Sequence, residues 1–163
     1  MSEAIKNVLR RMPYGFYALT TRSEDDLNAM VVNWVTQISF EPQLVAVGLA
    51  KSAYSYQLVQ RGQRVFALNL FLSEDAEAIK PFTKGRAKNP AKMEEASFEP
   101  APETGCPVLE GAAAYIEFKV HHLIDVGGDH AILVGEAIHA AELKPGSVDE
   151  SLSLLDLGWS YAG

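Results

Sequence analysis

A polar segment that could hold a phosphate stands between an apolar run and a stretch with helical spacing. It reads Lys51-Ser52-Ala53-Tyr54-Ser55. The N-terminus of a helix offers unpaired backbone N–H groups and the positive end of the helix dipole, and both attract an anion. Ser52 and Ser55 would add hydroxyl donors, and Lys51 would add a positive charge. Taken alone, the segment is also explained by a capping serine beside a solvated lysine.

Further polar side chains recur at regular intervals within residues 28–42, which read NAMVVNWVTQISFEP. Asn33, Thr36 and Ser39 follow one another at a spacing of three, and Asn69 lies inside a later apolar run. A polar side chain buried in a strand must find a hydrogen-bond partner. That partner can be a bound ligand or a neighbouring strand, and the sequence leaves both open.

The sequence predicts neither a metal site nor a disulfide. His121 and His122 are adjacent in an alternating strand, so we expect them to point to opposite faces and not to share one metal. His130 follows a turn at 127–129, where a lone histidine is commonly a turn hydrogen bonder. Cys106 is the only cysteine, and the glycine and proline on either side of it predict a turn.

The elements that must position these residues follow from apolar periodicity. The expected helices are 2–12, 52–60 and 73–80. The expected strands are 16–22, 29–35, 44–49, 65–72, 115–122 and 130–140. Residues 82–107 are rich in proline and charge and form a long excursion of the kind that is usually functional or mobile. Strands that mostly follow one another in antiparallel fashion predict a closed or partly closed barrel with short helices.

Composition narrows the function further. A length of 163 residues predicts one domain, 1–163, in which 143–163 can form a flexible tail. The net charge of −7 argues against nucleic acid and anionic membranes as partners, and no apolar run is long enough to span a bilayer. We therefore expect a cytoplasmic protein. A basic stretch within this acidic chain comprises Lys80, Lys84, Arg86, Lys88 and Lys92.

The order and spacing of several segments resemble the flavin reductase-like, FMN-binding split-barrel family. The segments are Met12-Pro13-Tyr14-Gly15, residues 28–42, residues 51–55 and Gly128-Asp129-His130. The resemblance covers about residues 10–140 and, weakly, 155–161. It implies a mainly β protein with an antiparallel, Greek-key-like split β-barrel. It also implies a homodimer that holds FMN near the subunit interface.

The family resemblance assigns residues to the cofactor. The implied FMN-binding residues are Asn33, Trp34, Val35, Thr36, Ser39, Lys51, Ser52, Ser55 and Asn69. The isoalloxazine ring would lie along the first five, and the phosphate would lie at the lysine and two serines. His130 would belong to the pocket shared by nicotinamide and flavin. Trp34 is bulkier than the residue common at this position and resembles the modules attached to flavodiiron proteins, and Gln43 replaces a usual second proline.

The implied activity is that of an NAD(P)H:flavin oxidoreductase, in which hydride passes from the nicotinamide to the flavin. The cofactors are then FMN with NADH or NADPH, and the sequence does not choose between the two nicotinamides. An electron-transfer FMN protein that is reduced by a redox protein partner is one alternative, and a non-enzymatic flavin-binding module is another. The basic stretch at 80–92 is explained by solvated loop charges or by attraction of an NAD(P)H phosphate.

Overall fold

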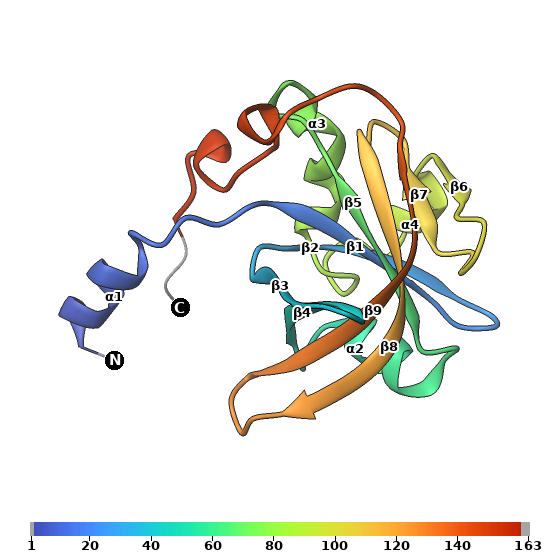
Figure 1. The fold of residues 1–163 in the computed structure, drawn as a ribbon, viewed down its shortest axis with the longest axis horizontal. Coiled ribbons are helices and arrows are strands. Elements are labelled where there is room, and N and C mark those ends of the chain that lie inside the picture. The colour runs from blue at the N-terminus through green and yellow to red at the C-terminus, as the bar shows by residue number, and fades with distance from the viewer. Residues whose placement is uncertain (1, 161–163) are drawn as a thin grey trace.

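Antiparallel strands dominate the computed structural model, which describes residues 2–160 (Figure 1). The last residues of the expected tail, 161–163, lie outside this range. The prediction of a mainly β protein with short helices is confirmed. Among the described residues no helix is both long and apolar enough to cross a membrane.

One sheet of seven strands forms the body, in the order β2-β1-β5-β8-β9-β4-β3, and all of its neighbouring strands are antiparallel. The strands are β1 (Tyr17–Arg22), β2 (Leu27–Val32), β3 (Val35–Phe40), β4 (Gln43–Ala50), β5 (Val65–Leu70), β8 (Ala114–Asp125) and β9 (His130–Glu142). A separate hairpin pairs β6 (Phe98–Pro100) with β7 (Pro107–Leu109). Although β2 and β3 are consecutive in the chain, they lie at opposite edges of the large sheet, which leaves the barrel split between them.

This split corrects one expected element. The sequence predicts a single strand at 29–35, whereas the structure ends β2 at Val32 and begins β3 at Val35. The reason is a change of partner, because β2 pairs with β1 and β3 pairs with β4. Asn33 and Trp34 form the connection between the two ladders.

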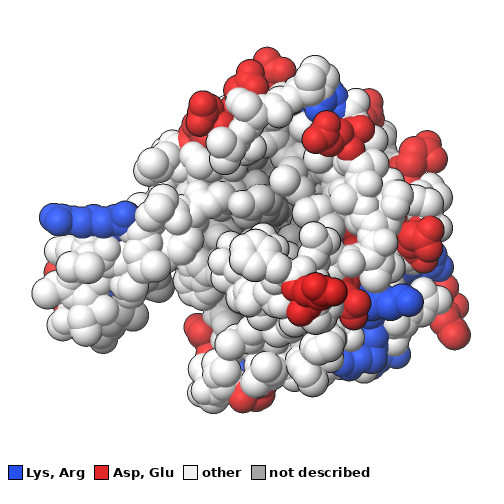
Figure 2. Space-filling model, viewed as in Figure 1, with Lys and Arg blue, Asp and Glu red and all other residues white. Residues whose placement is uncertain are grey.

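The helices are short. They are α1 (Glu3–Leu9), α2 (Tyr54–Arg61), α3 (Ala76–Ile79) and α4 (Lys92–Glu95). Short 3-10 turns occupy Ser73–Asp75, Lys80–Thr83, Val148–Glu150 and Leu155–Leu157. The Ser2 hydroxyl caps α1 by accepting a hydrogen bond from the Ile5 N–H at 3.3 Å, as Ser residues at this position commonly do. Figure 2 shows Lys and Arg on this projecting helix and Asp and Glu around the edge of the body.

Two hydrophobic clusters stabilise the body, and one of them lies between the strands of the curved seven-stranded sheet. At the centre of that cluster the rings of Phe66 and Phe118 stack with centroids 4.6 Å apart and planes 11° from parallel. Gly135 makes this stack possible, because a Cβ there would lie 2.4 Å from the Phe66 ring. The other cluster includes Leu152 and Leu154, which hold the C-terminal segment against the strands.

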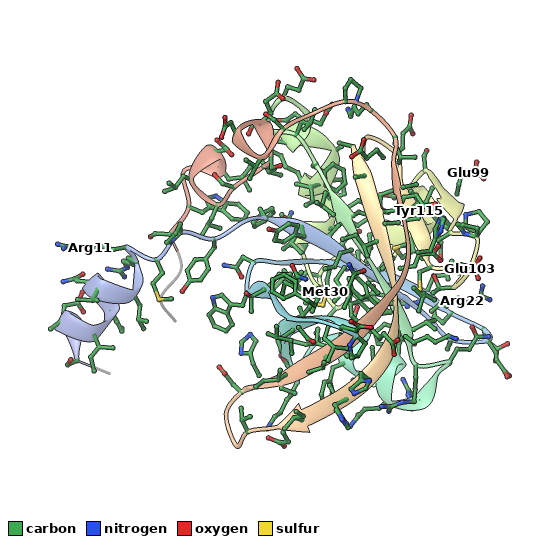
Figure 3. The ribbon with its side chains drawn as sticks, viewed as in Figure 1. Arg11, Arg22, Met30, Glu99, Glu103 and Tyr115 are labelled. Carbon is green, nitrogen blue, oxygen red and sulfur yellow. The ribbon has the colours of Figure 1, made fainter. Side chains whose placement is uncertain are left out.

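A buried carboxylate ties the 101–107 loop to the sheet. Glu117 is fully buried in β8 and accepts hydrogen bonds from the Glu103 and Thr104 N–H groups and from the Thr104 hydroxyl. Figure 3 marks Glu103 and Arg22 at this end of the molecule. A carboxyl group at this depth is tolerated because several donors surround it.

Candidate functional site

The connection between β2 and β3 meets the start of β9, which joins two of the predicted site residues. The rings of Trp34 and His130 lie with centroids 4.8 Å apart at an angle of 55°. The Trp34 carbonyl accepts a hydrogen bond from the Gly48 N–H at 2.8 Å. Gly48 leaves room for the indole, because a Cβ there would lie 2.9 Å from its ring. Trp34 is thus placed between β4 and His130.

Lys51 fastens the loop before α2 to the β8–β9 hairpin. Its backbone N–H donates to the Asp129 carbonyl at 3.0 Å, and its ammonium lies 2.5 Å from the Asp125 carboxylate. Asp125 also accepts a hydrogen bond from the Gly127 N–H at 2.8 Å. The hydrogen bonds from Lys51 and Gly127 hold the pKa of Asp125 below its usual value. The predicted phosphate lysine therefore already has an anionic partner.

His130 is oriented by its neighbour in the chain. Its Nδ1 lies 2.8 Å from the Asp129 carboxylate, and this hydrogen bond lowers the pKa of Asp129. Because Nδ1 is occupied by this contact, Nε2 is the ring nitrogen that remains for a ligand.

The two serines of the predicted phosphate segment are placed differently. Ser52 is exposed in the turn before α2. Ser55 is fully buried, and its hydroxyl oxygen accepts hydrogen bonds from Asn28 at 2.8 Å and Thr21 at 3.3 Å. No side chain caps α2 at Ala53 within the described part of the chain, so the first amides of this helix lack a side-chain acceptor.

A charged cluster stands at the same end of α2. The Tyr54 hydroxyl donates to the Asp26 carboxylate at 2.5 Å, and Arg86 donates to both carboxylate oxygens at 3.0 and 2.9 Å. The Arg86 guanidinium also lies 4.3 Å from the centre of the Tyr54 ring. Partial burial acts to raise the pKa of Asp26, but the hydrogen bonds from Tyr54 and Arg86 outweigh it and lower the pKa. The sequence places Arg86 in a basic stretch but gives no signal that joins it to Asp26.

The two predicted asparagines also differ in their surroundings. The Asn33 Nδ2 atom is buried and has no hydrogen-bond partner in the structure. Asn69 is fully buried, and its amide donates to the Pro107 carbonyl at 3.2 Å and accepts from the Leu109 N–H at 2.8 Å. Asn69 therefore connects β5 to β7, which is the structural alternative that the sequence left open. Asn33, in contrast, has a buried donor without a partner in the described structure, and such an unsatisfied group costs free energy.

The remaining predicted residues lie on β3 at the edge of the sheet. Val35 pairs with Val47 of β4. Thr36 is exposed, and its hydroxyl donates to the Gln37 carbonyl at 3.3 Å. Ser39 is half-buried next to a register shift between itself and Gln37.

Comparison with protein families shows to which family the chain belongs. The model of the flavin reductase like domain matches residues 9–157. The chain belongs to the flavin reductase-like family. The flavin reductase-like chain is 30% identical over 147 residues to the reductase component of 4-hydroxyphenylacetate 3-monooxygenase from Thermus thermophilus, and the match covers 89% of each. It is 32% identical over 129 residues to diflavin flavoprotein A 3 of Nostoc sp., covering 78% of this chain.

The second of these relatives is much longer, because the flavin reductase-like chain spans only 22% of its length. Among solved structures, the chain is similar to the NADH:FAD oxidoreductase SgcE6 of Streptomyces globisporus C-1027 in complex with NAD and FAD fragments. That similarity has a TM-score of 0.74 at 26% identity and covers 85% of this chain and 80% of the other.

One further side-chain prediction is tested by the structure of this flavin reductase-like protein. The prediction that His121 and His122 point to opposite faces is wrong, because the β8 register shifts between Val120 and His122 and brings the two rings to 4.6 Å. Within residues 2–160 no group of three His, Cys, Asp or Glu side chains could hold a metal. Cys106 is fully buried just before β7, and burial raises the pKa of its thiol to about 11. Its thiolate is thus disfavoured at neutral pH.

Proposed function

We propose that this flavin reductase-like protein binds FMN and transfers hydride to it from NADH or NADPH. The observation that carries the proposal is the meeting of a buried, unpartnered Asn33 amide with the Trp34–His130 pair in the break between two strand ladders. A flat ring with polar edges requires a largely apolar slot with a few well-placed donors and acceptors. The connection between β2 and β3 provides backbone N–H and C=O groups as well. Where the chain leaves one pair of strands and joins another, some of these groups are not used in strand pairing.

The residues fit the cofactor in two parts. Asn33 and the backbone of Trp34 to Thr36, followed by Ser39, would hold the ring. Lys51, the exposed Ser52 and the uncapped amides of α2 would hold the phosphate. Ser55 and Asn69 would support these groups from the interior through their hydrogen bonds to Asn28 and to β7.

The bound flavin would supply the acceptor for the hydride. The chain would contribute orientation and exclusion of water. His130, fixed by Asp129, would present Nε2 to the nicotinamide or to negative charge on the ring. Trp34 would shield one side of the pocket, because it fills the space between Gly48 and His130.

A homodimer in the cytoplasm is part of the same proposal. β3 is an edge strand of the large sheet, and two of its apolar side chains are exposed, Ile38 at 52% and Phe40 at 87%. Exposed apolar edges attract further chains unless they are covered. A second copy that covers β3 would lie beside residues 33–36 and would enclose the cofactor.

An electron-transfer flavoprotein is the second candidate, and Trp34 favours it. The indole packs beside His130, and there it would compete with a nicotinamide ring for the space next to the flavin. A relative with the name diflavin flavoprotein is consistent with a module that exchanges electrons with another redox centre. In that case a ferredoxin-type donor would reduce the bound FMN, and nicotinamide would not.

Anaerobic rapid mixing separates the two candidates. Protein saturated with FMN is mixed with NADH, with NADPH and with a reduced ferredoxin-type donor, while the flavin absorbance is followed. Bleaching by a nicotinamide supports the oxidoreductase, and bleaching by the protein donor alone supports the second candidate. Calorimetric titration with FMN and riboflavin for Lys51→Gln provides the binding test, and absence of FMN binding to folded wild-type protein would overturn both candidates.

A further inference from the structure

The N-terminal helix projects from the body and exposes much of its apolar surface to water. Ile5, Val8 and Met12 are 52%, 63% and 51% exposed, and α1 has no buried residue. Ile5 and Val8 are three residues apart on one side of the helix, and Met12 follows in the turn after the helix ends at Leu9. In Figure 1 the helix extends away from the sheet at the left. Exposing an apolar stripe of this kind to water costs free energy, and this cost disappears when another surface covers the stripe.

The N-terminal segment 2–12, which comprises the helix and the turn after it, is basic although the whole chain carries a net charge of −7. Lys6, Arg10 and Arg11 stand against one acidic residue, Glu3, within the projecting segment. Glu3 lies 3.8 Å from Arg10, which leaves a positive surplus along the arm. We refer to residues 2–12 as the arm. Its partner surface should therefore be apolar in the middle and acidic at the rim.

A groove of this description lies beside the β6–β7 hairpin. It has a volume of about 760 Å³, and its floor includes Phe98, Val108 and Leu143. Leu143 is 52% exposed, so a large apolar side chain in the groove faces water. Phe98 also packs against one of the two core clusters, which gives the groove a firm base.

The rim of this groove is acidic. Glu94, Glu99 and Glu110 line it, and all are exposed. The described lining contains no lysine or arginine. An apolar floor with carboxylates around it complements the apolar stripe and basic residues of the arm, and opposite potentials favour such an encounter.

The arm cannot reach the groove of its own chain. Figure 3 places Arg11 at one end of the longest axis of the molecule and Glu99 toward the other end. We propose that the arm of one copy docks in the acidic groove of a second copy, with Ile5, Val8 and Met12 facing Phe98, Val108 and Leu143. If the exchange is reciprocal, it closes a two-fold dimer. This contact is a second interface, separate from the β3 edge that the proposed homodimer would cover, and it does not depend on the proposed flavin chemistry.

Cysteine pairs test the contact directly. Val8→Cys combined with Leu143→Cys should form a disulfide-linked dimer under mild oxidation, and equal mixtures of the two single variants should link as well. Val8→Cys combined with Val126→Cys is the matched control, because Val126 is 60% exposed on the hairpin tip, away from the groove. The native Cys106 is buried and does not interfere. Equal linking rates for the two pairs would overturn the proposal.

Charge reversal supplies an independent measurement. The triple variant Lys6→Glu/Arg10→Glu/Arg11→Glu should weaken self-association about tenfold at low salt, as measured by sedimentation velocity. A second chain with Glu94→Lys/Glu99→Lys/Glu110→Lys should restore it, while circular dichroism checks that both variants fold. Unchanged association, or no restoration, contradicts arm docking. Two results together would assign the arm to a lipid surface and overturn the proposal. The full-length wild-type protein would sediment with anionic vesicles, and the Val8→Cys/Leu143→Cys pair would form no disulfide-linked dimer.

Discussion

The ammonium of Lys51 lies 2.5 Å from the carboxylate of Asp125, so the loop before α2 and the tip of the β8–β9 hairpin are joined by an ion pair. A backbone hydrogen bond from Lys51 to Asp129 runs beside it. The segment proposed to hold the phosphate is therefore fastened to the segment that presents His130. A phosphate that binds Lys51 must compete with Asp125 for the same ammonium.

This competition predicts the effect of Asp125→Asn. The variant removes the negative charge that holds Lys51, so FMN should bind up to about fivefold more tightly, which is the scale of an exposed ion pair. Riboflavin lacks the phosphate and should bind as before. Calorimetry with both ligands measures the difference, and Asp149→Asn, an exposed substitution on the Val148–Glu150 turn, is the control. An equal gain for riboflavin would show that the ion pair does not restrain the phosphate site.

Trp34 predicts how nicotinamide access can be changed. Trp34→Ser removes the indole from its place beside His130 and should raise kcat/KM for NADH or NADPH about tenfold, because a ring can then stack in the space released. The FMN dissociation constant should change little. Steady-state oxidation of both nicotinamides is measured with FMN at saturation. A fall in kcat/KM would indicate instead that the indole itself positions the nicotinamide.

The core has no room for a side chain at Gly135. A Cβ at this position would lie 2.4 Å from the Phe66 ring and 2.9 Å from the Phe118 Cβ. Gly135→Ala should therefore lower the free energy of unfolding by about 1–3 kcal/mol, which is typical of overpacking. Urea unfolding followed by circular dichroism gives the value. Gly85→Ala is the matched control, because a Cβ there meets nothing within 4 Å.

Lys92 predicts a pH dependence of stability. Burial of its side chain, together with the charge of Arg86, lowers its pKa from 10.5 to about 8. Between these two values the unfolded chain binds more protons than the folded one, so the free energy of unfolding rises with pH from about 8 to 10.5. Below pH 8 this contribution is constant.

Urea midpoints measured from pH 7 to 9.5 check this sign. The wild type should gain stability relative to Lys92→Met across the upper part of the range, where other groups titrate equally in both proteins. Lys88→Met, at an exposed position of the same stretch, should follow the wild type. Parallel curves for wild type and Lys92→Met would show that the folded state does not perturb this lysine.

The sequence predicted the elements best where apolar periodicity is strong. Residues 115–122 alternate clearly and residues 130–140 follow a glycine turn, and the two segments form the core of β8 and β9. The division at Asn33 was not predicted, because a change of ladder depends on which distant strand supplies the partner, and no local pattern records this. The same limit hid the bulge near His122, which needs the opposite strand of the hairpin to reveal it.

The site was predicted as a set of residues but not as a set of contacts. Ser52 and Ser55 look equivalent in the segment 51–55, yet only the structure shows that one is exposed and the other buried against Asn28. Their difference arises from the direction in which α2 packs on the sheet. The pairing of Arg86 with Asp26 also joins residues from separate elements, so local spacing could not reveal it.

The edge strands β2 and β3 follow one another in the chain but share no ladder in the described structure. The two sides of the split can therefore shift relative to each other by small rotations at Asn33 and Trp34, without breaking strand pairing between them. The break between the two edge strands thus coincides with the residues proposed to bind the ring. Ligand uptake would stiffen the barrel as a whole, so the cofactor would serve as a mechanical brace as well as a reactant.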